Sequence, residues 1–252
     1  MTDWPRDRIP AVATLPGGWH LQDSSAAIPR FSHTAVAAPA SWRKRSSRSV
    51  SIPNGKTGAT AGSALATCST GPESGWFTPP RRISPLYEIV ERLCQAQGYA
   101  QDIMYPAGVN GPKIGGDACA MPIPDRFADQ AALTCSLEHF EGDSDIRLFR
   151  ELARVLRPGG RVVVIPLYLF PHLAIQTDPL FGPSVAVPFD VGATVYCAEG
   201  FQNRHARFYS PEALRDRLLA LAEFRFTVYR LIGAETMDGI YARFALVAER
   251  RV

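Results

Sequence analysis

The sequence has 252 residues, of which 46% are hydrophobic, and a formal net charge of +3. This length accommodates one α/β domain or a smaller domain with an extension, and no apolar run is long enough to span a membrane. The five cysteines are odd in number and form no CxxC pair, which argues against a disulfide framework and favours a soluble, cytoplasmic protein.

Residues 1–82 are rich in Ser, Ala, Pro, Thr and Gly and show no sustained hydrophobic period. They carry 10 basic and 4 acidic residues, whereas residues 83–252 carry 17 basic and 20 acidic ones. Such a segment has too little patterned apolar surface to offset the entropy of ordering. We therefore expect a disordered basic arm, residues 1–82, followed by one folded domain, residues 83–252.

The basic run WRKRSSRSV, residues 42–50, fits either a nucleic-acid arm or a solvated stretch of a flexible tail. The second interpretation is favoured, because the folded domain that follows has an excess of acidic residues. Nucleic acid is therefore an unlikely partner.

The first patterned segment predicts a helix that begins near Ile83. Leu86, Ile89, Val90 and Leu93 recur at helical spacing, and Ser84 and Pro85 fit its N-terminus. The short segments GYAQDIMYP and AALTCSL then predict strands, with the glycine-rich stretch NGPKIGGD as a loop between them.

Strands and helices alternate in the rest of the chain. DSDIRLFRELARVLRPGG predicts a helix, RVVVIPLYLF a strand, and SPEALRDRLLALAEF a second helix after a long loop. FTVYRLIGA and YARFALVAER predict two closing strands separated by a short turn. The order predicts an α/β fold with a doubly wound, mostly parallel sheet and an antiparallel C-terminal strand pair.

One combination of motifs is distinctive. The stretch GGDACAMPIPDRFADQAALTCSLEHFEGDSD, continued by LFRELARVLRPGGRVVVIPLY, resembles class I S-adenosylmethionine-dependent methyltransferases of the type 11 group. The later segment RHARFYSPEALRDRL is also similar to a helix of that family. The subset with SLEHFEGDSD is one associated with saccharide and lipopolysaccharide gene clusters. The resemblance covers roughly residues 83–252 and implies a Rossmann-like methyltransferase fold.

The resemblance implies a site for S-adenosylmethionine. Asp102 corresponds to the acidic residue that accepts the ribose hydroxyls, and Asp117 and Ala118 to the element that meets the adenine edge. Gly116 precedes them, Met121 lines an apolar slot, and Ser136 and Leu137 lie beneath the methionine part. The alternative for Asp102 and Asp117 is a turn or a loop cap.

Glu138 and His139 fall near the methyl acceptor, which makes them the candidate catalytic residues; the alternative for His139 is a structural histidine. The neighbouring acidic side chains match neither a calcium nor a zinc pattern, so we expect no metal. His205, between two arginines, is expected in an exposed polar loop rather than at a substrate anion.

The sequence before the first helix departs from the family pattern. That family has an apolar strand and a glycine-rich loop there, whereas this chain has GWFTPPRRIS, residues 75–84. We therefore expect the central strand and the loop to be missing or degenerate. A frameshifted or truncated gene product is an alternative explanation for the abrupt junction.

These observations predict S-adenosylmethionine-dependent methyl transfer to a small-molecule or saccharide acceptor, with activity impaired by the loss of the loop. The rival hypothesis is a catalytically inactive binding protein that keeps the methyltransferase fold. A nicotinamide oxidoreductase is excluded, because no GxGxxG follows a predicted strand.

Overall fold

The computed structural model describes two short strand segments, 21–23 and 63–67, Leu86, and residues 97–178, 189–197, 204–231 and 242–252. Most of the predicted basic arm lies outside these residues, as does most of the first predicted helix, of which only Leu86 is described and is helical. The boundary between arm and domain at residues 82 and 83 therefore stays a prediction. Among the described helices, none is long and apolar enough to cross a membrane.

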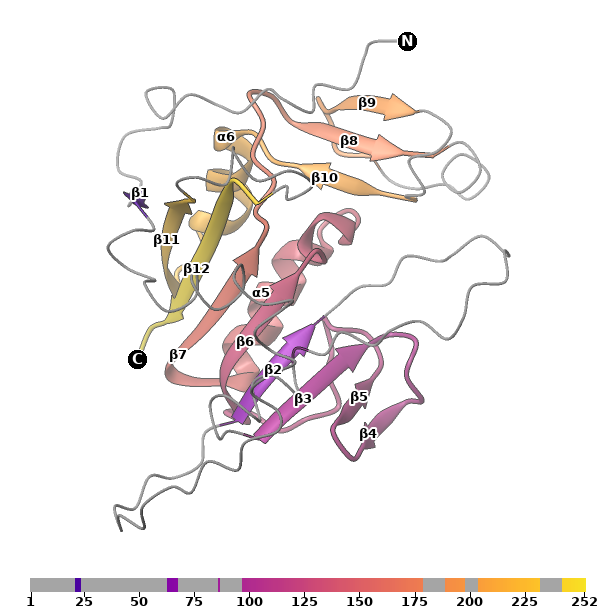
Figure 1. Ribbon diagram of the computed structural model, residues 1–252, viewed down its shortest axis with the longest axis vertical. Helices are drawn as coiled ribbons and strands as arrows, with labels where there is room; N and C mark the ends of the chain where they lie inside the picture. Colours follow the sequence, from indigo (N-terminus) through magenta and orange to yellow (C-terminus); the bar gives the residue numbers. More distant parts are fainter. Residues whose placement is uncertain are drawn as a thin grey trace, which may run out of the picture.

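A nine-stranded sheet forms the centre of the protein (Figure 1), with strand order β1-β11-β12-β7-β6-β2-β3-β5-β4. Strands β2, β3, β5, β6 and β7 run parallel to one another, and β12 pairs antiparallel with both β7 and β11. The strands are β1 Leu21–Asp23, β2 Ser63–Thr67, β3 Gln97–Asp102, β4 Gly108–Asn110, β5 Lys113–Gly115, β6 Ala128–Thr134, β7 Leu156–Ile165, β11 Phe224–Arg230 and β12 Phe244–Arg250. The predicted fold class, including the antiparallel C-terminal pair, is confirmed.

The central strand, expected from the sequence to be missing or degenerate, is present as β2. Strand β2 pairs in parallel with β3 on one side and with β6 on the other, and it comes from residues 63–67, inside the predicted arm. Its sequence SALAT has small residues and no β-branched aliphatic side chain, so it gives little strand signal. Because hydrogen bonds on both edges hold it, the sheet supplies the stability that the local sequence does not.

Helix α5, Ser144–Val155, packs on the sheet through Leu148, Phe149 and Leu152, which are completely buried. The ring of Phe149 contacts Phe224 of β11 edge-on, with centroids 5.7 Å apart. These three side chains recur at helical spacing and therefore form one buried face of the helix.

The second described helix begins at α6, Pro211–Leu214, and continues as a π-helical turn, Arg215–Leu219. The hydroxyl of Ser210 caps it by accepting a hydrogen bond from the Ala213 amide at 3.1 Å. Pro211 follows at the first position, as the sequence predicts.

A smaller sheet lies across one end of the large one (Figure 1) and consists of β8 Ala174–Thr177, β9 Thr194–Cys197 and β10 Ala206–Phe208. Its strands come from the segment that the sequence analysis treats as a long loop. β10 pairs antiparallel with β8, and β8 pairs parallel with β9. Phe170, Phe208 and Tyr196 are buried in a separate cluster beneath it.

The order of strands reverses between β2 and β6. From β2 the chain continues to β3 and β5 on one side, and then returns to β6 and β7 on the other. Ligands of open α/β sheets bind at the carboxyl ends of the strands beside such a reversal. The small sheet lies near this edge, so the fold indicates where the functional site is.

Candidate functional site

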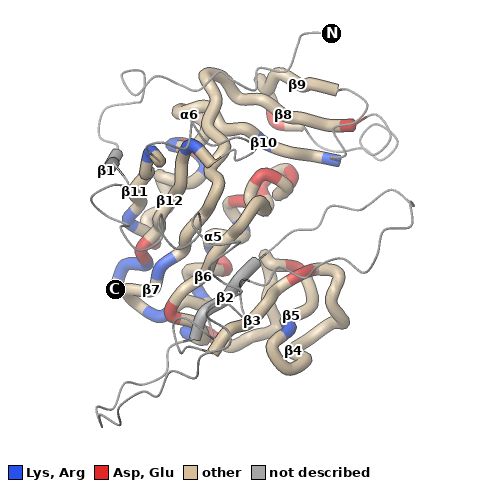
Figure 2. Tube along the Cα trace, in the orientation of Figure 1, with Lys and Arg blue, Asp and Glu red and all other residues tan. Residues whose placement is uncertain are grey.

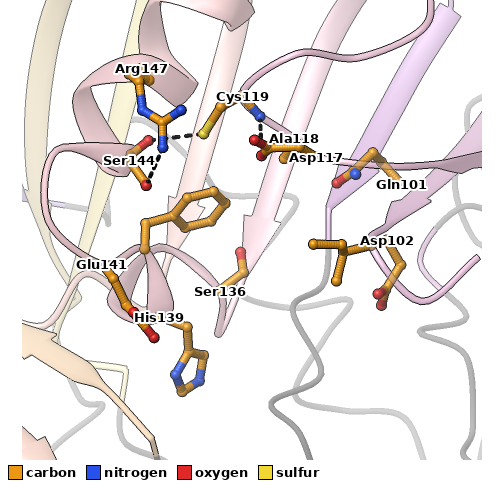
Figure 3. A pocket seen from close by; sticks show the side chains of 12 residues that line it. Gln101, Asp102, Asp117, Ala118, Cys119, Ser136, His139, Glu141, Ser144 and Arg147 are labelled. Atoms are coloured by element: carbon orange, nitrogen blue, oxygen red, sulfur yellow. Dashed lines mark hydrogen bonds between the residues drawn. The ribbon is translucent and has the colours of Figure 1, made fainter. Parts of the chain in front are cut away.

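A cavity of about 320 Å³ opens at the carboxyl ends of β3, β5 and β6 (Figure 3). This volume lies at the lower end of the range for small-molecule sites. Its lining residues are Gln101, Asp102, Ile103, Asp117, Ala118, Cys119, Ser136, His139, Phe140, Glu141, Ser144 and Arg147.

Five of the nine residues predicted from the sequence meet in this lining: Asp102, Asp117, Ala118, Ser136 and His139. The other four, Gly116, Met121, Leu137 and Glu138, are not among the lining residues. Met121 and Leu137 belong to the main hydrophobic core, as does Ala118, which also lines the cavity. The assignment of Met121 to an apolar ligand slot stays a prediction.

Asp102 is the last residue of β3 and is buried. Its Oδ1 accepts a hydrogen bond from the amide of Met104 at 2.9 Å, which turns the chain away from the sheet. The turn leaves Ile103 and Met104 exposed, and Ile103 lines the cavity beside the carboxylate. The turn that was the alternative for Asp102 thus exists, and it also holds the carboxylate at the cavity.

The loop after β5 depends on two glycines. A side chain at Gly115 would collide with the backbone of Pro106, and Gly116 has φ +131°, a conformation that other residues rarely adopt. The carbonyl of Gly116 accepts a hydrogen bond from Gln101 Nε2 at 2.6 Å. This contact joins the ends of β3 and β5, so that Asp102 and Asp117 both line the cavity.

Asp117 is exposed, and its Oδ1 accepts a hydrogen bond from the amide of Cys119 at 2.8 Å. The thiol of Cys119 donates to the Ser144 carbonyl at 3.2 Å. Burial and the charge of Asp117 raise the pKa of this thiol to about 12. The thiol of Cys119 is therefore neutral, and it lines the cavity without acting as a nucleophile.

The third strand end belongs to β6. Cys135 adopts φ +48°, a left-handed conformation, and the chain turns there into a short 3₁₀ helix, Leu137–His139. Backbone strain of this kind occurs at functional sites because the surrounding structure enforces it. The turn brings Ser136 and His139 to the cavity.

The tautomers of His139 and His205 follow from their partners. His139 Nδ1 lies 2.8 Å from the carbonyl oxygen of His205, and His205 Nδ1 lies 3.2 Å from the carbonyl oxygen of Glu138. A carbonyl only accepts, so each Nδ1 carries the proton and donates. In the neutral ring, each Nε2 then holds a lone pair.

His205 is buried, with 2% of its surface exposed, so the expectation of an exposed loop is wrong. Burial, followed by the charge of Arg207, lowers the pKa of His205 to about 4. The ring is therefore neutral at neutral pH. His205 is buried and bonded to Glu138 because it directly precedes strand β10 of the small sheet. The sequence pattern does not reveal this sheet.

The Oε1 of Glu138 lies 3.8 Å from His139 Nε2. Burial raises the pKa of this carboxyl above its ordinary value, and among the described residues its buried Oε2 has no hydrogen-bond partner. The carboxyl therefore lies near the imidazole nitrogen that is not bonded to His205, and it is not among the residues that line the cavity.

Seven lining residues were not predicted: Gln101, Ile103, Cys119, Phe140, Glu141, Ser144 and Arg147. Most of them are immediate neighbours of predicted residues. Their proximity to a strand end is therefore the feature of the sequence that could have identified them. Arg147 lies one helical turn into α5 and bonds to Ser144 Oγ at 2.7 Å (Figure 3). Arg147 can line the cavity only because the start of α5 faces it. The spacing of apolar residues along the helix does not by itself establish that orientation.

Comparison with known proteins gives a sequence match and several structural likenesses. Residues 91–164 match the family model described as a methyltransferase domain. A demethylmenaquinone methyltransferase of Corynebacterium kroppenstedtii is 36% identical over 104 residues, which cover 37% of this chain and 43% of that protein. The match thus spans less than half the length of the curated relative.

Two solved structures have lower identity. A SAM-dependent methyltransferase of Methanosarcina mazei is 16% identical, with 76% of this chain and 93% of that chain covered and a TM-score of 0.39. The 1,6-didemethyltoxoflavin-N1-methyltransferase of Burkholderia thailandensis is 14% identical, with 76% and 72% covered and a TM-score of 0.45. Residues 91–164 are thus similar in sequence to a methyltransferase domain.

Proposed function

We propose that the cavity binds S-adenosylmethionine and that the protein transfers its methyl group to an acceptor. The observation that carries the proposal is the meeting of Asp102, Asp117, Ala118, Ser136 and His139 in one cavity. They come from three separate strand ends at the reversal of strand order, the place where such sheets bind nucleotides.

The roles follow from the chemistry of the cofactor. The carboxylate of Asp102 can accept hydrogen bonds from the two ribose hydroxyls, and Asp117 with the amide of Ala118 can pair with the adenine edge. Asp102, Asp117 and Glu141 make the lining predominantly acidic, with Arg147 as its cationic member. Such a lining suits the positive charge of a sulfonium ion.

The segment that begins at Cys68 is the proposed partner of the methionine part of the cofactor. It directly follows the central strand β2, and its sequence CSTGPESG, residues 68–75, contains small residues and two glycines. Small residues let the backbone approach a ligand closely. With β2 at residues 63–67, the earlier reason for expecting the loop to be absent no longer applies; the loop itself lies outside the described residues.

His139 is the proposed acceptor-side group. Methyl transfer forms a bond between the acceptor nucleophile and the methyl carbon while the bond to sulfur breaks, and S-adenosylhomocysteine leaves. The unprotonated Nε2 of His139 can orient a hydroxyl or amine and take its proton. Most of the acceleration in this chemistry comes from positioning the two reactants.

We propose a small-molecule or saccharide acceptor. The names of the similar proteins describe methyl transfer to demethylmenaquinone and to 1,6-didemethyltoxoflavin, both of them small molecules. The saccharide alternative comes from the resemblance of SLEHFEGDSD to sequences of saccharide gene clusters.

Calorimetric titration with S-adenosylmethionine tests cofactor binding. We expect Asp102→Asn to weaken binding at least tenfold, because the loss of one charged hydrogen bond costs about 1.5–3 kcal/mol. The matched control is Asp129→Asn, at the opposite end of β6, where the carboxylate pairs with Arg157 at 2.7 Å. Absence of binding by the unmodified protein contradicts the proposal, as does equal weakening in both variants.

Methyl transfer itself is tested with S-adenosylmethionine labelled in the methyl group. The protein is incubated with pools of quinones, heterocycles and saccharides, and label is sought in each acceptor fraction. Cofactor binding without transfer to any pool would favour the rival hypothesis, an inactive binding protein of the same fold.

A further inference from the structure

The wall of the cavity that contains His139 is attached to the small sheet by side chains. Arg204 Nε donates to Glu141 at 2.6 Å, His139 Nδ1 donates to the His205 carbonyl, and His205 Nδ1 donates to the Glu138 carbonyl. In Figure 2, acidic residues gather at the end of α5 nearest to β10, whose near end is basic. Among the described residues, no backbone hydrogen bond joins 136–142 to 204–208.

Arg207 makes the most extensive of these attachments. Its Nη1 donates to the carbonyl of Phe140 and its Nη2 to the carbonyl of Gly142, each at 2.7 Å. The side chain is completely buried, so the guanidinium forms these bonds away from water. Phe140 follows His139 directly, and Glu141 lies between the two bonded carbonyls.

Two carboxylates hold the guanidinium in place. Asp190 accepts bonds from Nε at 2.5 Å and from Nη2 at 2.9 Å, and Asp145 lies 3.3 Å from Nη1. A buried cation with this many partners has one available geometry. Arg207 therefore fixes the distance between β10 and residues 140–142.

This distance determines whether His139 reaches its own partner. The bond from His139 Nδ1 to the His205 carbonyl spans the same gap. His205 lies two residues before Arg207 and directly precedes β10. If the gap widens, Nδ1 loses its acceptor while Glu138 Oε1 still lies near Nε2, so a proton on Nδ1 is no longer favoured over one on Nε2.

We infer that Arg207 is a positioning residue that keeps His139 in the Nδ1–H tautomer, with its Nε2 lone pair available at the cavity wall. The significance for catalysis rests on the proposed function, in which that lone pair binds the acceptor. Arg207 itself does not line the cavity.

Nitrogen-15 NMR of the histidine side chains in the full chain tests this inference without an acceptor. We expect His139 of the unmodified protein to show one protonated and one unprotonated nitrogen, with the proton on Nδ1. In Arg207→Lys, the charge remains but the fork that spans two carbonyls is lost, so the two nitrogen shifts of His139 should move towards an average. Single His139→Gln and His205→Gln variants assign the signals.

The matched control is Tyr209→Phe. The Tyr209 hydroxyl donates to Asp145 at 2.7 Å in the same buried network, and among the described residues no hydrogen bond joins it to the carbonyls of Phe140 or Gly142. This variant should keep the tautomer of His139 while losing stability. If Arg207→Lys does not fold, Asp190→Asn loosens the same guanidinium and should give a smaller change of the same kind.

An unchanged His139 tautomer in a folded Arg207→Lys protein overturns the inference, and so does an equal change in Tyr209→Phe. Calorimetry with S-adenosylmethionine on the same samples separates this result from the proposed function. We expect affinity to change by less than about threefold in Arg207→Lys, because Asp102 and Asp117 lie on the opposite wall. If the unmodified protein binds no cofactor, the proposed function fails while the tautomer comparison still tests the role of Arg207.

Discussion

The deep burial of the His205 ring makes the stability of the folded protein sensitive to acid. Its pKa is lowered from 6.5 to about 4 in the folded protein, mainly by burial. A lowered pKa means that the unfolded chain binds the proton more readily. The stability contributed by the neutral ring is therefore fully present above pH 6.5 and is lost as the pH falls towards 4.

We predict that His205→Gln removes this part of the acid sensitivity. The unmodified protein should lose about 3 kcal/mol more than the variant between pH 7.5 and pH 4, from the shift of the His205 pKa. Urea unfolding at both pH values measures the difference. The control is His172→Gln, in which a half-buried ring bonded to Tyr196 at 3.1 Å is replaced. Equal pH dependence of the unmodified and His205→Gln proteins would refute the prediction.

Tyr209→Phe tests the buried network from another residue. Burial alone raises the pKa of Asp145, but hydrogen bonds and charges from Arg217 and Arg207 lower it below its ordinary value, so the carboxylate is charged. The loss of a hydroxyl bonded to this charge should cost about 1.5–3 kcal/mol at pH 7. Urea unfolding measures the cost, with Tyr229→Phe on β11 as the control for removal of a tyrosine hydroxyl. A loss no larger than that of the control would contradict the prediction.

At the level of elements, the central position of β2 predicts how the chain tolerates truncation. Removal of residues 1–60 deletes the edge strand β1 and keeps β2, so cooperative unfolding should persist. Removal of residues 1–75 also deletes β2, which leaves β3 and β6 with unpaired facing edges. Thermal unfolding followed by circular dichroism should show a cooperative transition for the first chain and none for the second.

Two further results decide the meaning of this comparison. The substitution Ala66→Pro in the full chain removes one backbone N–H group within β2. Proline cannot donate a hydrogen bond to a neighbouring strand, so this variant should also destabilise the sheet. If the chain without residues 1–75 unfolds cooperatively at the same temperature as the longer one, β2 is dispensable and the predicted boundary at residue 83 is the better description of the domain.

The elements that could be predicted are those with a strong local pattern. The β-branched run of β7 and the helical spacing of α5 give clear signals, and both form where expected. β5 was missed because KIG lies within a glycine-rich segment. β2, β8 and β10 are stabilised by pairing with distant segments, which single-sequence patterns do not contain.

The same contrast holds for the site. Asp102, Asp117 and His139 could be predicted because the ends of parallel strands meet at one edge of a sheet. The attachments by Arg204 and Arg207 could not, because they join residues more than 60 positions apart. Met121 lies in the hydrophobic core, and its contact with a ligand stays a prediction.

For the whole molecule, the proposed cofactor should act as a stabiliser. A ligand at 100 times its dissociation constant adds about 2.7 kcal/mol to the free energy of unfolding. For a chain of this size, that corresponds to a rise in the melting temperature of about 5–10 °C. Thermal unfolding with and without S-adenosylmethionine measures it. At the same ligand concentration, a tenfold loss of affinity in Asp102→Asn should reduce the rise to about half, whereas Asp129→Asn should keep it in full.

The attachment of β10 to residues 138–142 also bears on the order of folding. The hydrogen bonds concerned join residues 63 to 67 positions apart, and they depend on a sheet that forms from the chain after β7. Contacts over such separations require closure of a long loop before they contribute stability. The wall with His139 therefore takes its final shape only after the small sheet has folded, so a nascent chain that ends soon after β7 has the strand ends of the cavity but not its completed wall.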